Sequence, residues 1–450
     1  MVLNSVITRF TLPPDDRLPG LEALLDTELV AGLLRAGARL DLGVLECRVT
    51  SMRYRPGGSC IACYDVTRED RATGARQALA WYGKCFTPED FPEAYQRARS
   101  RTWSDAALGQ PVAALAGRHI LLFAYPNDGK LDALRILQQA HLLPKYLHGR
   151  LQEGDPCTDA RWVATVVRYK PEKRAVLRCQ LGSGTRTQDG LAPAVFLRVY
   201  PDSRGLTEFR TMCCLRRWLG QRADLAIPEP VAFDVDHHVL ILRGLAGDTL
   251  DSLTGSGRRR EAFARTAQAL AALHGCNKAD VPGRTVADHL AKARRVAAAL
   301  VKFLPALQEQ VVAMERALLA RAPAEQDGAC GFVHGDFHCG QVLVDGGRIG
   351  LVDFERAHTG AVAFDLGNWL ASCRYEQLEG HGSADFDLAD EFLEAYARSA
   401  TWAPPPGAVA WWAALALFHM AIKPVRSVDA NAPDKVAKLL EAVGDWLRTA

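Results

Sequence analysis

Residues 331–370 read GFVHGDFHCGQVLVDGGRIGLVDFERAHTGAVAFDLGNWL and decide the fold of the chain. In this stretch the acid Asp336 is followed five residues later by the carboxamide of Gln341, and a second acid, Asp353, follows an apolar run. An Asp-Gly-Gly turn at 345–347 separates two short strand-like runs. A hairpin here brings residue 353 back beside residue 341. The stretch therefore predicts that two acids and an amide share one site.

Transfer of a phosphoryl group needs this combination of side chains. A carboxylate must orient the acceptor hydroxyl and take its proton, and Asp336 is the candidate base. Two hard oxygen ligands must hold Mg²⁺ against the phosphates of a nucleotide, and Gln341 and Asp353 are the candidates. Asp336 and Gln341 have the spacing of the H-x-D-x-x-x-x-N catalytic loop of kinases, and Asp353-Phe354 matches the start of their D-F-G. These residues favour direct transfer from Mg-ATP.

The complete stretch resembles the aminoglycoside phosphotransferase-like kinases, a superfamily related to the protein kinases. Its pattern HGDxHxxN is met by residues 334–341 with Gln in place of Asn, and DFxxAxxGxxxxDL is met by residues 353–366. Within the superfamily the motifs are most similar to bacterial sugar kinases of the maltokinase and glucosamine kinase type, which carry an N-terminal cap. The resemblance covers roughly residues 160–420. It implies an α+β, protein-kinase-like bilobal fold with an antiparallel-sheet N-lobe and a mainly helical C-lobe.

The resemblance also implies a nucleotide site in the N-lobe. The family's third-strand lysine, which holds the α and β phosphates, is matched by Arg198, and its partner glutamate by Glu208. Arginine keeps the charge but has a different reach and a forked geometry. Leu242 and Gly244 belong to the expected hinge, where backbone groups meet adenine. The turn Pro171–Ala175 either covers the phosphates or is a solvated hairpin tip.

An internal duplication precedes this region. Residues 48–67, 78–86 and 120–134 align in the same order with residues 162–181, 194–202 and 239–253. In this alignment Arg53-Tyr54-Arg55-Pro56 falls on Arg168-Tyr169-Lys170-Pro171, and each copy reads as two strands around a turn, a third strand and a helix. The alternative is that two unrelated half-buried hairpins share alternating apolar residues.

The duplication predicts three units along the chain. Residues 1–150 form a cap that resembles a second N-lobe, residues 151–250 form the nucleotide-binding N-lobe, and residues 251–450 form the helical C-lobe with the catalytic loop. In the cap, Lys84 and Glu93 occupy the places of Arg198 and Glu208. Because no catalytic loop follows the cap directly, we expect Lys84 to be a surface lysine.

Composition excludes several classes of protein. The chain has 48% apolar and 24% charged residues and a net charge of +2, so it is globular and has no global basic field for nucleic acid. The apolar run Ala408–Phe418 is shorter than the ~18 residues that a membrane span needs, which predicts a buried helix and no membrane partner. Met1–Pro14 has no secretory pattern, so a cytoplasmic location is expected. Cys60 and Cys63 form a CxxC inside an expected strand, where their side chains point to opposite faces.

The acceptor is expected to be a small molecule with a free hydroxyl, namely a sugar, an amino sugar or an aminoglycoside. Seven acids between residues 376 and 394 would suit a cationic acceptor, or they form a solvated helix face. Glu355 directly follows the metal acid and is a candidate for the acceptor pocket. Trp369, Trp411 and Trp412 either stack on a sugar or belong to the core. His334, His338 and Asp365 are expected to brace the loop.

Two other functions remain open. A catalytically inactive, kinase-like nucleotide-binding or regulatory module is suggested by the duplicated N-lobe and by Arg198. The presence of Asp336, Gln341 and Asp353 together argues against it. A protein kinase is disfavoured because the sequence lacks both a G-x-G-x-x-G loop and an A-P-E segment.

Overall fold

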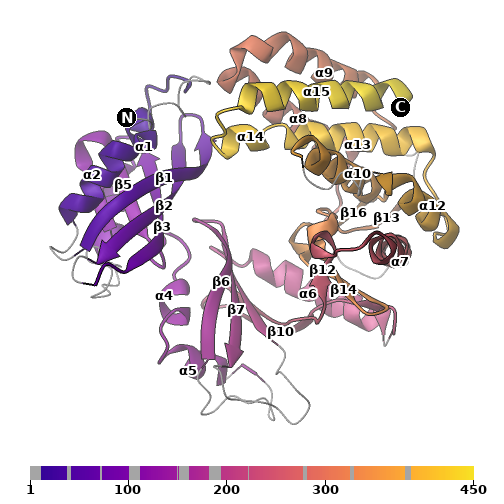
Figure 1. The fold of residues 1–450 in the computed structure, drawn as a ribbon, viewed down its shortest axis with the longest axis horizontal. Coiled ribbons are helices and arrows are strands. Elements are labelled where there is room, and N and C mark those ends of the chain that lie inside the picture. The colour runs from indigo at the N-terminus through magenta and orange to yellow at the C-terminus, as the bar shows by residue number, and fades with distance from the viewer. Residues whose placement is uncertain are drawn as a thin grey trace.

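The computed structural model describes most of the chain. It covers residues 12–37, 42–70, 73–100, 112–148, 150–151, 162–181, 194–220, 222–276, 281–324, 329–380 and 387–450. Three parts follow one another along the chain: a first sheet, a second sheet and a mainly helical part (Figure 1). This α+β architecture, with antiparallel sheets first and helices after them, is the predicted protein-kinase-like fold.

The first sheet has five antiparallel strands in the order β1-β2-β3-β5-β4. The strands are β1 (Leu42–Arg55), β2 (Ser59–Asp70), β3 (Arg76–Phe86), β4 (Val112–Leu115) and β5 (Ile120–Ala124). Helices α1 (Leu21–Leu25) and α2 (Thr27–Gly37) precede it, α3 (Phe91–Ser100) follows β3, and a 3-10 turn, η2 (Ala116–Arg118), joins β4 to β5. Apolar residues of α1, α2 and the sheet form one core.

The second sheet repeats this topology, with the strand order β6-β7-β8-β11-β10. Its strands are β6 (Trp162–Lys170), β7 (Arg174–Leu181), β8 (Val195–Val199), β10 (Glu229–Asp234) and β11 (Val239–Arg243), and α6 (Arg204–Leu219) follows β8. Lys84 pairs with Ile61 on the neighbouring strand as Arg198 pairs with Val176. The registers therefore agree with the sequence alignment, which supports the duplication.

Two short helices link the sheets. They are α4 (Leu134–Leu137) and α5 (Leu143–His148), and their apolar residues share a core with β6, β7, β8 and β11 of the second sheet. The segment from Leu131 onward was grouped with the cap in the sequence-based division at residue 150. Its packing belongs to the second sheet because its apolar face covers that sheet.

The C-terminal part is built mainly from helices. They are α7 (Ser256–His274), α8 (Val286–Phe303), α9 (Gln308–Ala320), α10 (Ala363–Leu378), α12 (Ala389–Ser399), α13 (Pro406–Met420), α14 (Lys423–Arg426) and α15 (Ala432–Thr449). Two small sheets accompany them. The first contains, in order, β12 (Asp248–Thr249), β14 (Val342–Asp345), β15 (Arg348–Leu351) and β9 (Leu225–Ala226). The second pairs β13 (Cys330–Val333) with β16 (His358–Ala361). Short 3-10 turns complete it: η3 (Leu250–Ser252), η4 (Pro305–Leu307), η5 (Cys339–Gln341) and η6 (Phe354–Arg356).

Helix α13 is the central helix of this part. Pro406–Arg426 is long and apolar enough to cross a membrane, but 83% of its apolar window is buried inside the protein, so it is a core helix. Trp411, Trp412 and Trp369 are all buried and belong to the core. Gly367 of α10 lets the two helices approach closely, because a Cβ at this position would lie 2.5 Å from the backbone carbon of Trp412.

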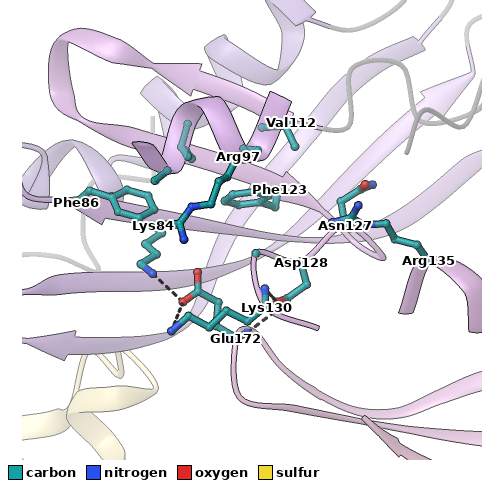
Figure 2. A pocket seen from close by; sticks show the side chains of 14 residues that line it. Lys84, Phe86, Arg97, Val112, Phe123, Asn127, Asp128, Lys130, Arg135 and Glu172 are labelled. Atoms are coloured by element: carbon teal, nitrogen blue, oxygen red, sulfur yellow. Dashed lines mark hydrogen bonds and ion pairs between the residues drawn. The ribbon is translucent and has the colours of Figure 1, made fainter. Parts of the chain in front are cut away.

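The cap is attached to the hairpin tip of the second sheet. The Nζ of Lys84 donates to Oε2 of Glu172 at 2.7 Å, and Lys130 also points toward this carboxylate (Figure 2). Asp128 accepts from the hydroxyl of Tyr169 at 2.8 Å and from the backbone N–H of Glu172 at 2.9 Å. Arg53 donates to the carbonyl oxygen of Pro171 at 2.8 Å.

The expectation of a surface lysine in the cap was therefore wrong. The side chain of Lys84 is 13% exposed and is buried by the contact between the two sheets. Glu93 does not pair with it, because its side chain lies on the outer face of α3 and contacts Arg97 instead. The cap also reaches the C-terminal part, where Lys302 of α8 donates to the hydroxyl of Tyr54 at 2.9 Å.

Candidate active site

The predicted hairpin is present and brings the candidate residues together. Strands β14 and β15 pair in register, with Val342 opposite Leu351. The backbone N–H of Val352 donates to the carbonyl oxygen of Gln341 at 3.0 Å. Because Asp353 follows this bonded residue, the sequence positions 341 and 353 meet at the base of the hairpin, as the turn pattern predicted.

A buried carboxylate holds the loop that carries Asp336. Asp365 is fully buried at the start of α10, and it accepts from the backbone N–H groups of His334 at 2.6 Å and Gly335 at 2.9 Å. His274 of α7 lies 3.2 Å from the same carboxylate. Gly335 has φ +82 and no room for a side chain, since a Cβ would lie 2.2 Å from the carbonyl oxygen of Arg356. Asp365 therefore shapes the loop, as expected.

Both loop histidines make bracing contacts. Nε2 of His334 donates to the carbonyl oxygen of Val352 at 2.9 Å, which ties the loop to the end of β15. His338 accepts from the backbone N–H of Gly340 at 3.2 Å, and its Nε2 lies 3.2 Å from the side-chain amide of Gln341. The Gln341 amide is thus held in place at the base of the hairpin, and the histidines serve as structural supports.

Asp336 faces an arginine across the site. Its Oδ1 accepts from Nη1 of Arg356 at 3.2 Å, and the two side chains are 31% and 42% exposed. Asp336 is thus accessible from a cavity, while the backbone of its loop is fixed from behind. Asn368 of α10 adds a support that the motif analysis missed, because its amide donates to the carbonyl oxygen of Phe337 at 2.9 Å.

Asp353 lies at the centre of a buried charge cluster. Its carboxylate accepts from Nη1 and Nη2 of Arg174 at 2.9 and 3.2 Å and from Nη1 of Arg198 at 3.0 Å. Arg198 also contacts Glu208, and Arg174 contacts Glu355. Burial raises the pKa of Asp353, but the charges of Arg198 and Arg174 outweigh it and hold that pKa well below the usual range.

The cluster joins both lobes. The expected pair of Arg198 and Glu208 is formed, and the hydroxyl of Tyr200 also donates to Glu208. Arg174 belongs to the turn Pro171–Ala175, for which the sequence left open a position over the phosphates or a solvated hairpin tip. It lies at the start of β7, immediately after the turn that follows β6, and it extends from the hairpin tip to the acids that follow β15. This tip is therefore not a solvated turn, because its arginine is buried against the C-lobe.

The expected hinge residues lie in the interior of the second sheet. Leu242 is buried on β11, which pairs with β8 on one side and β10 on the other. The N–H of Gly244 donates to the carbonyl oxygen of Ala194 at 2.8 Å and is not free for a purine.

A family model identifies the chain. The model of the phosphotransferase enzyme family (APH) matches residues 184–415, just over half of the sequence. The chain belongs to this family. It is therefore an enzyme of the phosphotransferase class, and the matched segment contains the catalytic loop, Asp353 and Arg198.

Several solved structures are similar to the chain at low sequence identity. A choline kinase from Cryptosporidium parvum is 12% identical and covers 69% of this chain and 96% of its own, with a TM-score of 0.49. A choline/ethanolamine kinase family protein from Mesorhizobium loti is 16% identical over 68% and 99% of the two chains, with a TM-score of 0.45. A macrolide 2'-phosphotransferase from Brachybacterium faecium is 20% identical over 67% and 97%, with a TM-score of 0.44. No curated protein matches the chain.

A cavity of about 530 Å³ opens beside Asp336 of this phosphotransferase. Its walls come from β6, the catalytic loop and the helices α7, α8, α10, α13 and α14. Arg198, Asp353 and Gly244 are not among the described residues that line it. The cavity gives a small molecule access to the carboxylate of Asp336.

Two expectations for the acceptor side differ from the geometry. Glu355 does not line the cavity in the described part of the chain, because Arg174 holds it in the charge cluster. The structure describes all of the acids between residues 376 and 394 except Asp385. Among these described acids, only Glu376 lines the cavity. Three others pair with nearby cations: Glu379 with Lys435, Glu391 with Arg260, and Glu394 with Arg398.

Proposed function

We propose that this enzyme transfers the γ-phosphate of ATP to a hydroxyl of a sugar-sized small molecule, with Asp336 as the general base. The observation that carries the proposal is the hairpin that brings residues 341 and 353 together, with the loop of Asp336 tied to its end through His334 and Val352. In the reaction the hydroxyl oxygen bonds to the γ-phosphorus while the bond between that phosphorus and the leaving ADP oxygen breaks. The hydroxyl proton passes to the carboxylate of Asp336 and then to solvent.

The donor set fits Mg²⁺. Asp353 offers a carboxylate and Gln341 an amide oxygen, which are hard ligands of the kind that magnesium prefers, and the nucleotide phosphates and water complete its shell. When bound, the ion neutralises charge on the transferring phosphate. In the present arrangement both oxygens of Asp353 accept from Arg174 and Arg198. These guanidinium groups would exchange the carboxylate for the phosphates when a nucleotide enters.

The proposed nucleotide-binding residues are Arg198 and Glu208, with Leu242 and Gly244 marking the hinge beside which the base would lie. Glu208 holds Arg198 at the edge of the cluster, and the arginine fork suits phosphate oxygens. We add Arg174 to this set, because it reaches Asp353 from the hairpin tip that lies above the expected phosphate position. We also retain the division into a cap, an N-lobe and a C-lobe, with the cap ending before Leu131 where packing on the second sheet begins.

Release of ADP in the presence of candidate acceptors tests this function. The Asp336→Asn variant keeps the shape of the side chain and removes the base, so acceptor-dependent ADP release should fall by about 10²- to 10⁴-fold. Binding of Mg-ATP, followed by a thermal shift, should be retained. Asp345→Asn, at the exposed tip of the hairpin, is the matched control. Retained turnover in the Asp336 variant would assign the base role to another group.

An inactive nucleotide-binding module is the second candidate. Arg198 in place of lysine and the engagement of Asp353 by Arg174 favour it. The two functions differ in one measurement. Nucleotide binding without ADP release for any acceptor in the panel would support the module and overturn the kinase proposal.

A further inference from the structure

The acceptor-side cavity is strongly cationic although the whole chain is nearly neutral. Among the described residues that line it, seven are lysine or arginine and three are aspartate or glutamate. The chain as a whole carries a net charge of only +2. The cationic lining is therefore a local feature of this cavity, and it requires a physical explanation.

Five of the cations have no carboxylate partner in the described part of the chain, and one of them, Lys423, lies over the ring of Tyr375. Arg356 pairs with Asp336, and Arg259 donates to backbone carbonyl oxygens. The structure shows no carboxylate of the described chain within ion-pair distance of the remaining five, which are Arg168, Lys170, Lys292, Lys423 and Arg426. Four of these five residues are exposed and Lys170 is half-buried, so a molecule that enters the cavity can contact them.

These five cations approach the cavity from both lobes. Arg168 and Lys170 extend from β6, Lys292 from α8, and Lys423 and Arg426 from α14. Like charges brought together from three elements repel one another and destabilise the empty site. Enclosure in the cavity and the nearby charge of Arg356 lower the pKa of Lys292 to about 8. Burial and the surrounding cations likewise lower the pKa of Lys170 to about 8.

We propose that the acceptor of this enzyme carries its own negatively charged group, a phosphate or a carboxylate, in addition to the hydroxyl that is phosphorylated. This inference rests on the proposed function and names the acceptor class. A dianionic phosphate compensates more of the five charges than a carboxylate does, so sugar phosphates are preferred over sugar acids. A cavity of about 530 Å³ falls within the range of ~300–1,000 Å³ for small-molecule sites and accommodates such a molecule.

The same lining excludes the cationic acceptors expected from the sequence. An amino sugar or aminoglycoside would face the unpaired cations and find Asp336, Asp251 and Glu376 as the only carboxylates among the described lining residues. Asp336 already pairs with Arg356. Arg198 and Asp353, which are proposed to meet the ATP phosphates and the metal, do not line this cavity among the described residues, so the cations of α8 and α14 lie outside the proposed nucleotide site.

Binding measurements on the full-length protein test the inference without requiring turnover. The probes are inorganic phosphate, glucose 6-phosphate, glucuronate, glucose and glucosamine, each titrated calorimetrically at the same ionic strength. Glucose 6-phosphate should bind at least 10-fold more tightly than glucose, with glucuronate between them and glucosamine weakest. Lys292→Met and Arg426→Met should each weaken glucose 6-phosphate binding by about 10- to 100-fold, the value of one charge-assisted contact. Lys438→Met, an exposed cation on α15, is the matched control and should change nothing.

Kinetic measurements locate the anion relative to the nucleotide. The two cavity variants should raise KM for a phosphorylated acceptor and leave KM for ATP unchanged. The inference is overturned if glucose or glucosamine binds as tightly as glucose 6-phosphate, or if no anion binds more tightly to the wild type than to the double variant. It is also overturned if Mg-ATP abolishes anion binding, because the anion would then occupy the nucleotide site. Loss of ADP release with intact anion binding would instead contradict the proposed function alone.

Discussion

Replacing Asp353 with asparagine tests the charge cluster that joins the two lobes. Asp353 accepts from both Arg174 and Arg198, while Glu355 and Glu208 each contact one of these arginines. Asparagine keeps the size of the side chain and removes its charge, so two ion pairs become hydrogen bonds from arginine to a neutral amide oxygen. Charge-assisted interactions contribute about 1.5–3 kcal/mol each.

The net loss should be smaller than the sum of the two interactions. Each arginine keeps one glutamate, and removal of one acid relieves repulsion among three neighbouring carboxylates. We therefore expect the free energy of unfolding to fall by about 2–3 kcal/mol, less than the ~3–5 kcal/mol for a buried charge left without any partner. Asp345→Asn, on the same hairpin but exposed, should change it by less than about 0.5 kcal/mol.

Urea unfolding of the full chain without nucleotide measures this difference, followed by tryptophan fluorescence. The Mg²⁺ dependence of ADP release then tests the second role of Asp353, because loss of a metal ligand should shift the dependence to higher Mg²⁺ concentration. If the Asp353 and Asp345 variants are equally stable, the arginine contacts contribute nothing and the reasoning fails. An unchanged Mg²⁺ dependence would remove Asp353 from the metal site.

Three other predictions concern the support of the site. A double-mutant cycle of Lys84→Met and Glu172→Gln should give a coupling energy of about 2 kcal/mol in urea unfolding. The same cycle on the exposed pair Arg48–Asp65 should give under about 1 kcal/mol. Equal coupling energies would show that the cap contact is only a surface pair. Burial raises the pKa of Asp365, but hydrogen bonds from His274 and the loop outweigh it, so the pKa is lowered on folding. The stability that these bonds provide is present above the pKa of the unfolded state, about 3.9, and is lost as pH falls toward the lower pKa of the folded state. The Asp365→Asn variant should therefore lose less stability than the wild type as pH falls. An unchanged loss of stability at acid pH would contradict this prediction. Gly367→Ala should destabilise the enzyme by about 1–3 kcal/mol, because the new Cβ would meet the backbone of α13. Gly257→Ala on α7 is the control, since a Cβ at that position has free space. If the Gly367 variant melted at the same temperature as the wild type, the two helices would be able to separate.

The parts of the site that depend on local sequence could be predicted. The hairpin of 342–351, the bracing histidines and the role of Asp365 follow from turn residues and from spacing within one segment. The duplicated sheet was also predictable, because strand alternation and turns repeat at nearly constant spacing. In each case the deciding interactions are short-range or repeat a pattern.

Interactions between distant segments could not be predicted in this way. Arg174 lies 179 residues before Asp353 in the chain, and Lys84 lies 88 residues before Glu172. The five cavity cations that lack a carboxylate partner in the described chain come from three elements that are far apart in the sequence. The net charge of the chain, which is near zero, therefore gives no sign that they gather in one cavity. The acids between residues 376 and 394 suggested a cationic acceptor, but three of them form salt bridges and only Glu376 lines the cavity in the described part of the chain. Sequence alone gives the charges of these residues but not their partners.

The positions of these contacts restrict the relative movement of the lobes. The turn after β6 is held by the cap through Glu172 and by the C-lobe through Arg174. The cap is in turn bonded to α8 through Tyr54 and Lys302. Opening of the space between the lobes must therefore break the Arg174 contacts and also one of the contacts of the cap. Since nucleotide phosphates would replace the carboxylate of Asp353 as the partner of Arg174, entry of the nucleotide can release the first restraint while the cap keeps the turn in position.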